Sequence, residues 1–129
     1  RSMHMTERRV GSVTILDLSG TITIDADAAR LKDKINSLLL QQQTSVILNL
    51  AEVSYIDSGG LGQIAASYAA VMKAGGALKL LHVNKRNHDL LSITRLVVIL
   101  HTFDSEDAAL RSFEALPAVA AGLVAQHDL

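Results

Sequence analysis

The sequence predicts an α/β domain in which a small mixed β-sheet of four to five strands carries about four helices. Three observations lead to this fold class. The chain has 129 residues, of which 49% are hydrophobic, and this is enough for one buried core. Strand-like and helix-like segments alternate in the order β-β-α-β-α-β-α-β-α, as expected for helices packed on a sheet. The sequence contains no internal repeat and no evident linker.

The first two elements are expected to be strands that form a hairpin. Val10–Leu18 alternates polar and apolar residues and is followed by Ser19-Gly20, a pattern typical of a half-buried strand. A shorter strand around Thr6–Val10 precedes it, with Gly11-Ser12 as the turn. The opening residues 1–5, RSMHM, resemble a vector remnant and are left outside the predicted fold.

The third element is expected to be a helix, because Asp25 can cap it and apolar residues recur behind it at helical spacing. This apolar stripe consists of Ala28, Leu31, Ile35, Leu38 and Leu39. The polar run Gln41–Gln43 marks the end of the helix. Ser45–Leu50 is short, apolar and β-branched, which predicts a buried strand, and Ala51–Asp57 is expected to be a loop.

A second long helix is predicted by apolar residues at positions i, i+3, i+4, i+7 and i+11. This stripe consists of Leu61, Ile64, Ala65, Tyr68 and Met72. Gly75-Gly76 is expected to end the helix, since glycine readily adopts the left-handed conformation found after helix C-termini. Ala77–Val83 is the next predicted strand.

A short helix and a last strand are expected next. Either Asn84 or Asn87 can cap this helix, which reaches Leu91–Arg95. The apolar run Val97–Leu100 predicts the strand.

The closing helix is expected to begin at Asp104 or Ser105 and to stop near Pro117. Its apolar residues are Leu110, Phe113 and Leu116. The role of the tail from Ala118 stays open.

The composition excludes several classes of protein. Twelve basic and 13 acidic residues leave a net charge of −1 without a block of like charge, so no nucleic-acid partner is expected. No apolar run approaches the ~18–20 residues that span a bilayer, so no membrane insertion is expected. The absence of cysteine agrees with a cytoplasmic protein. The five histidines follow no metal-binding pattern, and we expect no metal site.

The stretch SYIDSGGLG, residues 54–62, raises the question of what Ser58 does. Its flanks resemble the nucleophile motif of trypsin-like proteases, but two β-barrels do not fit in this length, and the typical glycine and proline flanks are absent. Ile56 also stands where the hydrolase motif G-x-S-x-G has its first glycine. Ser58 is therefore not expected to be a nucleophile, and the protein is not expected to be an enzyme.

Residues 60–65 also match the dinucleotide pattern G-x-G-x-x-A. That pattern should follow a strand directly, with an acidic residue about 20 positions later. Here seven residues separate Leu50 from Ser58, and the next strand ends near Asn84 instead of an acid. We therefore expect no dinucleotide site.

A helix cap at Asp57 or Ser58 explains part of the motif. Capping does not explain the three glycines of this turn, Gly59, Gly60 and Gly62, each of which costs about 0.5–1 kcal/mol relative to alanine. Such glycines indicate a close approach of another backbone or an unusual φ. A serine at this bare helix start is open to an incoming kinase, and the helix N-terminus tolerates a phosphate there.

The order of these motifs resembles the STAS domain family, and in particular its single-domain anti-sigma factor antagonists. The resemblance rests on VILNLAEVSYIDSGGLGQIAASY, AGGALKLLHVN and LLSITRLVVILHTFDSEDAALRSF, with VTILDLSGTI upstream. It covers about residues 6–116, which we take as the domain; residues 117–129 are then a C-terminal extension. Three positions depart from the family pattern. Gly59 replaces a second serine, Thr23 stands where many relatives have an acid, and Arg95 replaces a usual glycine.

The resemblance implies that Ser58 is a phosphoacceptor. The unphosphorylated protein would bind an anti-sigma factor that is a serine kinase of the GHKL type, and this binding would release the sigma factor. Phosphorylation would end the binding, and a PP2C-type phosphatase would restore it. ATP and metal would belong to these partners, and the protein itself would carry no cofactor. The partner-binding residues implied in this way are Asp25, Asp57, Ser58, Gly59, Gly60, Gly62 and Gln63.

Two other roles of the same domain stay open: a subunit of a lipid-transporting ABC complex and a subunit of a stressosome-like assembly. The lipid-transport subunit would bind its ATPase permanently and would not need phosphorylation. A weak homodimer is also left open.

Overall fold

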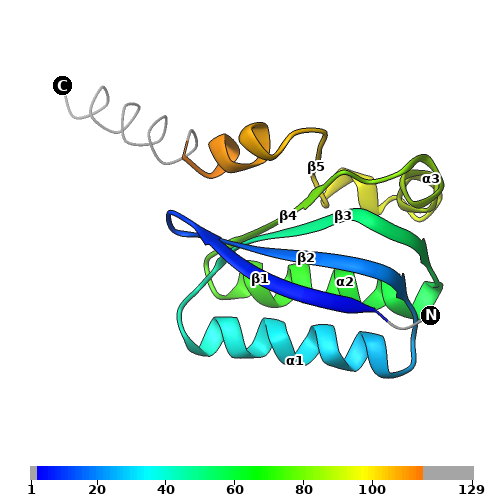
Figure 1. The fold of residues 1–129 in the computed structure, drawn as a ribbon, viewed down its shortest axis with the longest axis horizontal. Coiled ribbons are helices and arrows are strands. Elements are labelled where there is room, and N and C mark those ends of the chain that lie inside the picture. Colours follow the sequence, from blue (N-terminus) through cyan, green and yellow to red (C-terminus); the bar gives the residue numbers. More distant parts are fainter. Residues whose placement is uncertain (1–2, 115–129) are drawn as a thin grey trace.

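The computed structural model describes residues 3–114, which form one five-stranded sheet with helices on both faces (Figure 1). The strands lie in the order β1-β2-β3-β4-β5; β1 and β2 are antiparallel, and each later pair is parallel. The strands are β1 (His4–Val10), β2 (Val13–Ile22), β3 (Ser45–Ile56), β4 (Ala77–Leu81) and β5 (Thr102–Phe103). The helices are α1 (Ala26–Leu40), α2 (Ser58–Lys73), α3 (Lys85–Ile93), the 3-10 turn η1 (Leu96–Val98) and residues 106–114.

This architecture confirms the predicted fold class and element order. The predicted hairpin is present, with Val10 opposite Val13 across the turn. The predicted last strand is wrong: Leu96–Val98 forms the 3-10 turn, and the strand follows at Thr102–Phe103. A short apolar run is compatible with either a strand or a buried turn, and here the core takes up Leu100 without a strand.

Alternate residues of the central strands point to two separate cores. Leu16 and Leu18 of β2 face α1 and α2, which lie side by side under one face of the sheet (Figure 1). Ile15 of β2 and Ile47 of β3 face the other side, where Ala109 of the closing helix covers them. A sheet with both faces covered explains why its strands carry long apolar runs.

Two strands are longer than expected. β2 continues through Ser19-Gly20 to Ile22, because these residues form an irregularity in the pairing with β3 and do not end the strand. Gly20 has φ +90°, a conformation that glycine adopts freely. β3 continues to Ile56, so the predicted loop Ala51–Asp57 is wrong apart from its last residue. The strand therefore ends directly before Asp57 and Ser58.

The beginning of α1 differs from the prediction. Asp25 occupies the N-cap position, but its side chain makes no capping hydrogen bond. The carboxylate of Asp27, only 5% exposed, accepts hydrogen bonds from the amide of Met3 (3.0 Å) and from the amide and hydroxyl of Thr23 (3.3 and 3.1 Å). Met3 is itself buried and His4 begins β1, so residues from position 3 onward belong to the fold, contrary to expectation.

The buried stripe of α2 is rotated relative to the prediction at its C-terminal end. Leu61 and Ile64 are buried as expected, but Val71 is buried and Met72 is 48% exposed. The helix ends at Lys73, and Gly75 follows its C-cap residue in the predicted left-handed conformation, with φ +85°. The amide of Gly76 donates to the carbonyl of Val71, which completes a Schellman motif.

The open choices of helix cap are settled by the structure. The side chain of Asn84 accepts from the amide of Asn87 and caps α3. The hydroxyl of Ser105 accepts from the amide of Ala108 and caps the closing helix. The predicted residues Leu116 and Pro117 and the extension 117–129 lie outside the described residues.

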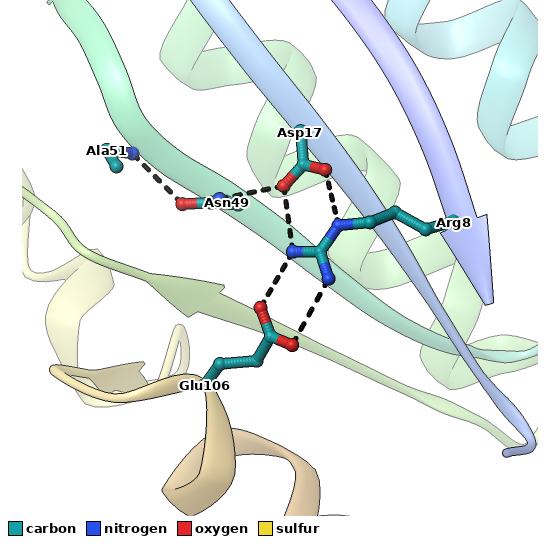
Figure 2. Close-up of polar contacts among 5 residues, drawn as sticks. All are labelled: Arg8, Asp17, Asn49, Ala51 and Glu106. Carbon is teal, nitrogen blue, oxygen red and sulfur yellow. Dashed lines mark hydrogen bonds and ion pairs between the residues drawn. The ribbon is translucent and has the colours of Figure 1, made fainter. Parts of the chain in front are cut away.

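A polar network attaches the closing helix to the sheet (Figure 2). The guanidinium of Arg8 donates to both carboxylate oxygens of Asp17 (2.6 and 3.1 Å) and of Glu106 (2.7 and 3.1 Å). Asn49 donates to Asp17 and accepts from the amide of Ala51. The hydrogen bonds from Arg8 lower the pKa of the Asp17 and Glu106 carboxyls. The network therefore joins β1, β2, β3 and the closing helix on the face opposite α1.

Candidate functional site

Ser58 is the first residue of α2, and its side chain is exposed to solvent. Within residues 3–114 its hydroxyl makes no hydrogen bond. β3 ends two residues earlier, so a strand anchored in the middle of the sheet positions the serine. The hydroxyl is thus held at a defined position and has no hydrogen-bond partner among these residues.

Asp57 holds this turn together. One carboxylate oxygen accepts from the amide of Gly60 (2.7 Å), and the other accepts from the amide of Ile24 (3.2 Å). The amide of Asp57 donates to the carbonyl of Ile22 (3.1 Å). Asp57, and not Ser58, is therefore the helix cap, and it also fixes the β2–α1 connection against the start of α2.

Close approach accounts for two of the three glycines. A Cβ on Gly60 would lie 2.1 Å from the carbonyl oxygen of Ile22, and one on Gly59 would lie 2.3 Å from the Cβ of Ile24. Gly62 has open space around it. None of the three has a positive φ. The expected close approach of another backbone thus holds for Gly60, whereas Gly59 meets the side chain of Ile24 and Gly62 meets neither.

The first turn of α2 has backbone amides that can still bind an anion. A helix leaves its first amides without intrahelical partners. The amide of Gly60 is taken by Asp57, whereas those of Ser58 and Gly59 make no hydrogen bond within the described part of the chain. The positive end of the helix dipole also favours negative charge at this point. A phosphate on Ser58 would therefore meet two free donors.

The structure brings most, but not all, of the predicted partner-binding residues together. Asp25 is exposed and directly follows Ile24, which is bonded to Asp57. Gln63 lies elsewhere: its amide donates to the hydroxyl of Ser67 (3.1 Å), and both residues line a groove against α1. Gln63 therefore does not share the surface of Ser58.

The structure bears on the two other hypotheses for this turn, a dinucleotide site and a serine nucleophile. The spacing argument against a dinucleotide site is wrong, because β3 reaches Ile56 and the strand does lead directly into the glycine turn. The carboxylate of Asp57, however, already occupies the helix start where a pyrophosphate would bind. A serine nucleophile needs a base within hydrogen-bond reach, and among residues 3–114 no histidine is hydrogen-bonded to Ser58.

The sequence did not reveal two exposed apolar side chains, one beside the Ser58 turn and one on α3. Ile24 is 68% exposed beside the glycine turn, and Ile93 of α3 is 80% exposed. Between β3 and α3 lies a groove of about 240 Å³ that contains Tyr55, Ile56 and Ile93. Helical periodicity indicates buried residues, and an apolar residue outside a periodic stripe carries no signal of an exposed patch in the sequence.

Two further classes of site find no support in the described residues. Across residues 3–114 no three His, Cys, Asp or Glu side chains are grouped so that they could hold a metal ion. In that same part of the chain, no helix is long and apolar enough to span a membrane.

Comparison with known proteins gives a consistent family. A model described as the STAS domain matches residues 4–109. The chain is 30% identical over 107 residues to the anti-sigma F factor antagonist of Paenibacillus polymyxa, covering 81% of this chain and 89% of that protein.

Solved structures agree in fold. The crystal structure of a proposed anti-sigma factor antagonist from Thermotoga maritima superposes with a TM-score of 0.80 at 24% identity, over 85% of this chain and 94% of that one. The Bacillus cell fate determinant SpoIIAA, solved in its phosphorylated form, superposes with a TM-score of 0.68 at 19% identity, over 84% and 99% of the two chains.

Proposed function

The chain belongs to the STAS domain family, and on this premise we propose that it is an anti-sigma factor antagonist that phosphorylation of Ser58 switches off. The observation that carries the proposal is the geometry of Ser58. An exposed, unbonded hydroxyl stands at a helix start that a neighbouring residue, Asp57, already caps. The fold does not use this hydroxyl, so it is available to a kinase.

In the unphosphorylated state the surface around Ser58 binds a serine-kinase anti-sigma factor of the GHKL type, which then releases its sigma factor. The protein acts in the bacterial cytoplasm and contributes a binding surface and a hydroxyl. The kinase contributes ATP, its metal and the catalytic groups. A PP2C-type phosphatase returns the protein to the binding state.

Phosphorylation acts on the partner surface and leaves the fold in place. A phosphoserine carries about −1.5 to −2 charges at neutral pH. The free amides of Ser58 and Gly59 and the helix dipole can accept that charge locally. Outside the turn, the phosphate adds to the exposed negative charge of Asp25 and to that of Asp57. The result is an acidic patch that repels an acidic partner surface.

The deciding experiment is incubation of the protein with ATP and each GHKL-type anti-sigma factor of the same genome, read by mass spectrometry. We expect one phosphate on Ser58 in the native protein and none in Ser58→Ala. Ser54→Ala is the matched control: Ser54 lies in the same stretch, but its hydroxyl donates to the carbonyl of Gly20. This control should be phosphorylated like the native protein.

Two outcomes would overturn the proposal. Phosphate on another residue of Ser58→Ala would remove the site assignment. Stable, phosphate-independent association with an ATPase of a lipid-transport complex, without any transfer to Ser58, would favour the transport-subunit role instead.

A further inference from the structure

The surface of α3 and η1 carries apolar side chains that the fold does not bury. Ile93 is 80% exposed, Val98 is 72% exposed and Ile99 is 41% exposed. A single exposed apolar residue is ordinary, but a group of them at one place usually marks an interaction site. These three follow each other closely in the chain, and η1 packs directly against α3.

A groove joins this surface to the end of β3. It has a volume of about 240 Å³, and its lining includes Ile56, Leu90 and Ile93. Tyr55 lies at its edge, with the guanidinium of Arg86 4.7 Å from the ring centre. Asn87 and Asp89 also line the groove, so its apolar interior is bordered by both a cation and a carboxylate.

That cation is not neutralised by a carboxylate. Lys85 pairs with Asp89 (3.0 Å), whereas Arg86 forms no ion pair with any residue between 3 and 114. Arg95 is also exposed and forms none there. Arg86 at the groove and Arg95 at the start of η1 are thus uncompensated cations, and such charges are complementary to an acidic segment with an apolar anchor.

The backbone conformation of Arg95 also indicates a functional surface. Its φ is +66°, a left-handed conformation that glycine adopts without strain and arginine does not. The chain therefore carries a charged side chain at a position where glycine would be the more stable choice. Strain of this kind is frequently found at functional surfaces.

The surface is continuous with the region of Ser58. Ile56 lines the groove and precedes Ser58 by two residues, so their Cα atoms are at most about 7.6 Å apart. A partner that covers Ser58 extends over the groove with little additional reach.

We propose that α3 and η1 form a second docking surface that binds an acidic, amphipathic segment of the anti-sigma factor, with Ile93 and Val98 as anchors and Arg86 and Arg95 as charge contacts. This inference rests on the proposed function. A lipid surface fits less well, since polybasic lipid contacts use about four to eight Lys or Arg, and only two uncompensated arginines lie here.

The test measures the affinity of purified variants for the anti-sigma factor that phosphorylates the native protein. Ile93→Ser/Val98→Ser should weaken binding about tenfold or more, as expected for buried apolar anchors. Leu40→Ser is the matched control, because Leu40 is 87% exposed at the far end of α1 (Figure 1). It should change binding less than about twofold.

The charges are tested in parallel. Arg86→Glu should weaken binding about tenfold and reduce its salt dependence, whereas Arg111→Glu, on the exposed side of the closing helix, should leave both unchanged. Arg95→Gly should raise the melting temperature and weaken binding. A purely structural role of Arg95 would not produce these opposite changes.

Three other results would each contradict the second docking surface. If the native protein binds and Ile93→Ser/Val98→Ser binds equally well, the second surface is refuted while the proposed function stands. If the native protein binds no anti-sigma factor, both fail. If it sediments with phosphatidylglycerol–phosphatidylcholine vesicles and the double variant does not, the occupant is a membrane and the proposal is overturned.

Discussion

The N-termini of α1 and α2 are stabilised in different ways. Each helix follows directly after a central strand, and each has an aspartate at its N-cap position, Asp25 or Asp57. At α1 the stabilising carboxylate belongs to buried Asp27, which turns inward to Met3 and Thr23. At α2 the cap itself makes the hydrogen bonds, and the next side chain remains free.

This difference shows which of two similar turns is available to a partner. A carboxylate that turns inward contributes to stability and cannot be reached. The α2 turn combines a fixed backbone, bonded through Asp57 and packed at Gly60, with a hydroxyl that stability does not need. A modification of Ser58 can therefore change binding without unfolding the domain.

The largest expected effect is at Gly60. Gly60→Ala would place a Cβ 2.1 Å from the Ile22 carbonyl oxygen, and we expect a loss on the order of 3 kcal/mol in the free energy of unfolding. Gly62→Ala is the control, since its surroundings are open; it should gain up to about 1 kcal/mol in helix propensity. Urea denaturation measures both, and equal effects would contradict this account of the turn.

A smaller effect is expected at Asp27, and it depends on pH. Burial raises the pKa of Asp27, but hydrogen bonds from Met3 and Thr23 and the charge of Arg30 outweigh it, so the pKa lies below its ordinary value. The stabilisation is then fully present above the unfolded pKa of about 3.9 and is lost as the pH falls through the folded value.

Asp27→Asn should therefore cost about 2 kcal/mol at neutral pH, and the difference from the native protein should narrow as the pH falls below about 4. Asp17 and Glu106 also have lowered pKa values, but both proteins contain them and their contribution cancels in the difference. Urea denaturation at a series of pH values tests this. A difference independent of pH would mean that the charge of Asp27 is not involved.

Asp57→Ala should cost about 1–2 kcal/mol, because it removes the α2 cap and the bond to Ile24. Asp25→Ala removes an aspartate at the equivalent position of α1 that makes no capping bond, and it should change stability by less than about 0.5 kcal/mol. Thermal unfolding of the pair compares the two helix starts directly. A larger cost at Asp25 would reverse the comparison.

The smallest effect on stability is expected at Ser58. Ser58→Asp should stay within about 1 kcal/mol of the native protein and yet weaken binding to the anti-sigma factor, while Ser58→Ala should retain both stability and binding. Calorimetry and a binding titration on the same samples separate the two quantities. Unfolding of Ser58→Asp would show that the α2 start does not tolerate the charge.

The sequence alone predicted the element order and the ends of the long helices, because these depend on local chemistry. Periodic apolar residues identified α1 and α2, and the glycine at position 75 ended α2 where expected. The motif around Ser58 was also recognisable, since its residues are contiguous. The last strand was misplaced, because an apolar run does not reveal whether the chain will be extended or coiled against the core.

What the sequence determined by itself is the identity of the helices and strands and the location of the Ser58 turn. Only the tertiary structure decided that Asp27 is buried, that Asp57 bonds to Ile24, and that Gly60 meets the carbonyl of Ile22. It alone also placed Ile93 beside the end of β3. Each of these observations depends on a contact between residues more than 20 positions apart in the sequence. Such contacts arise only when the sheet brings distant segments together.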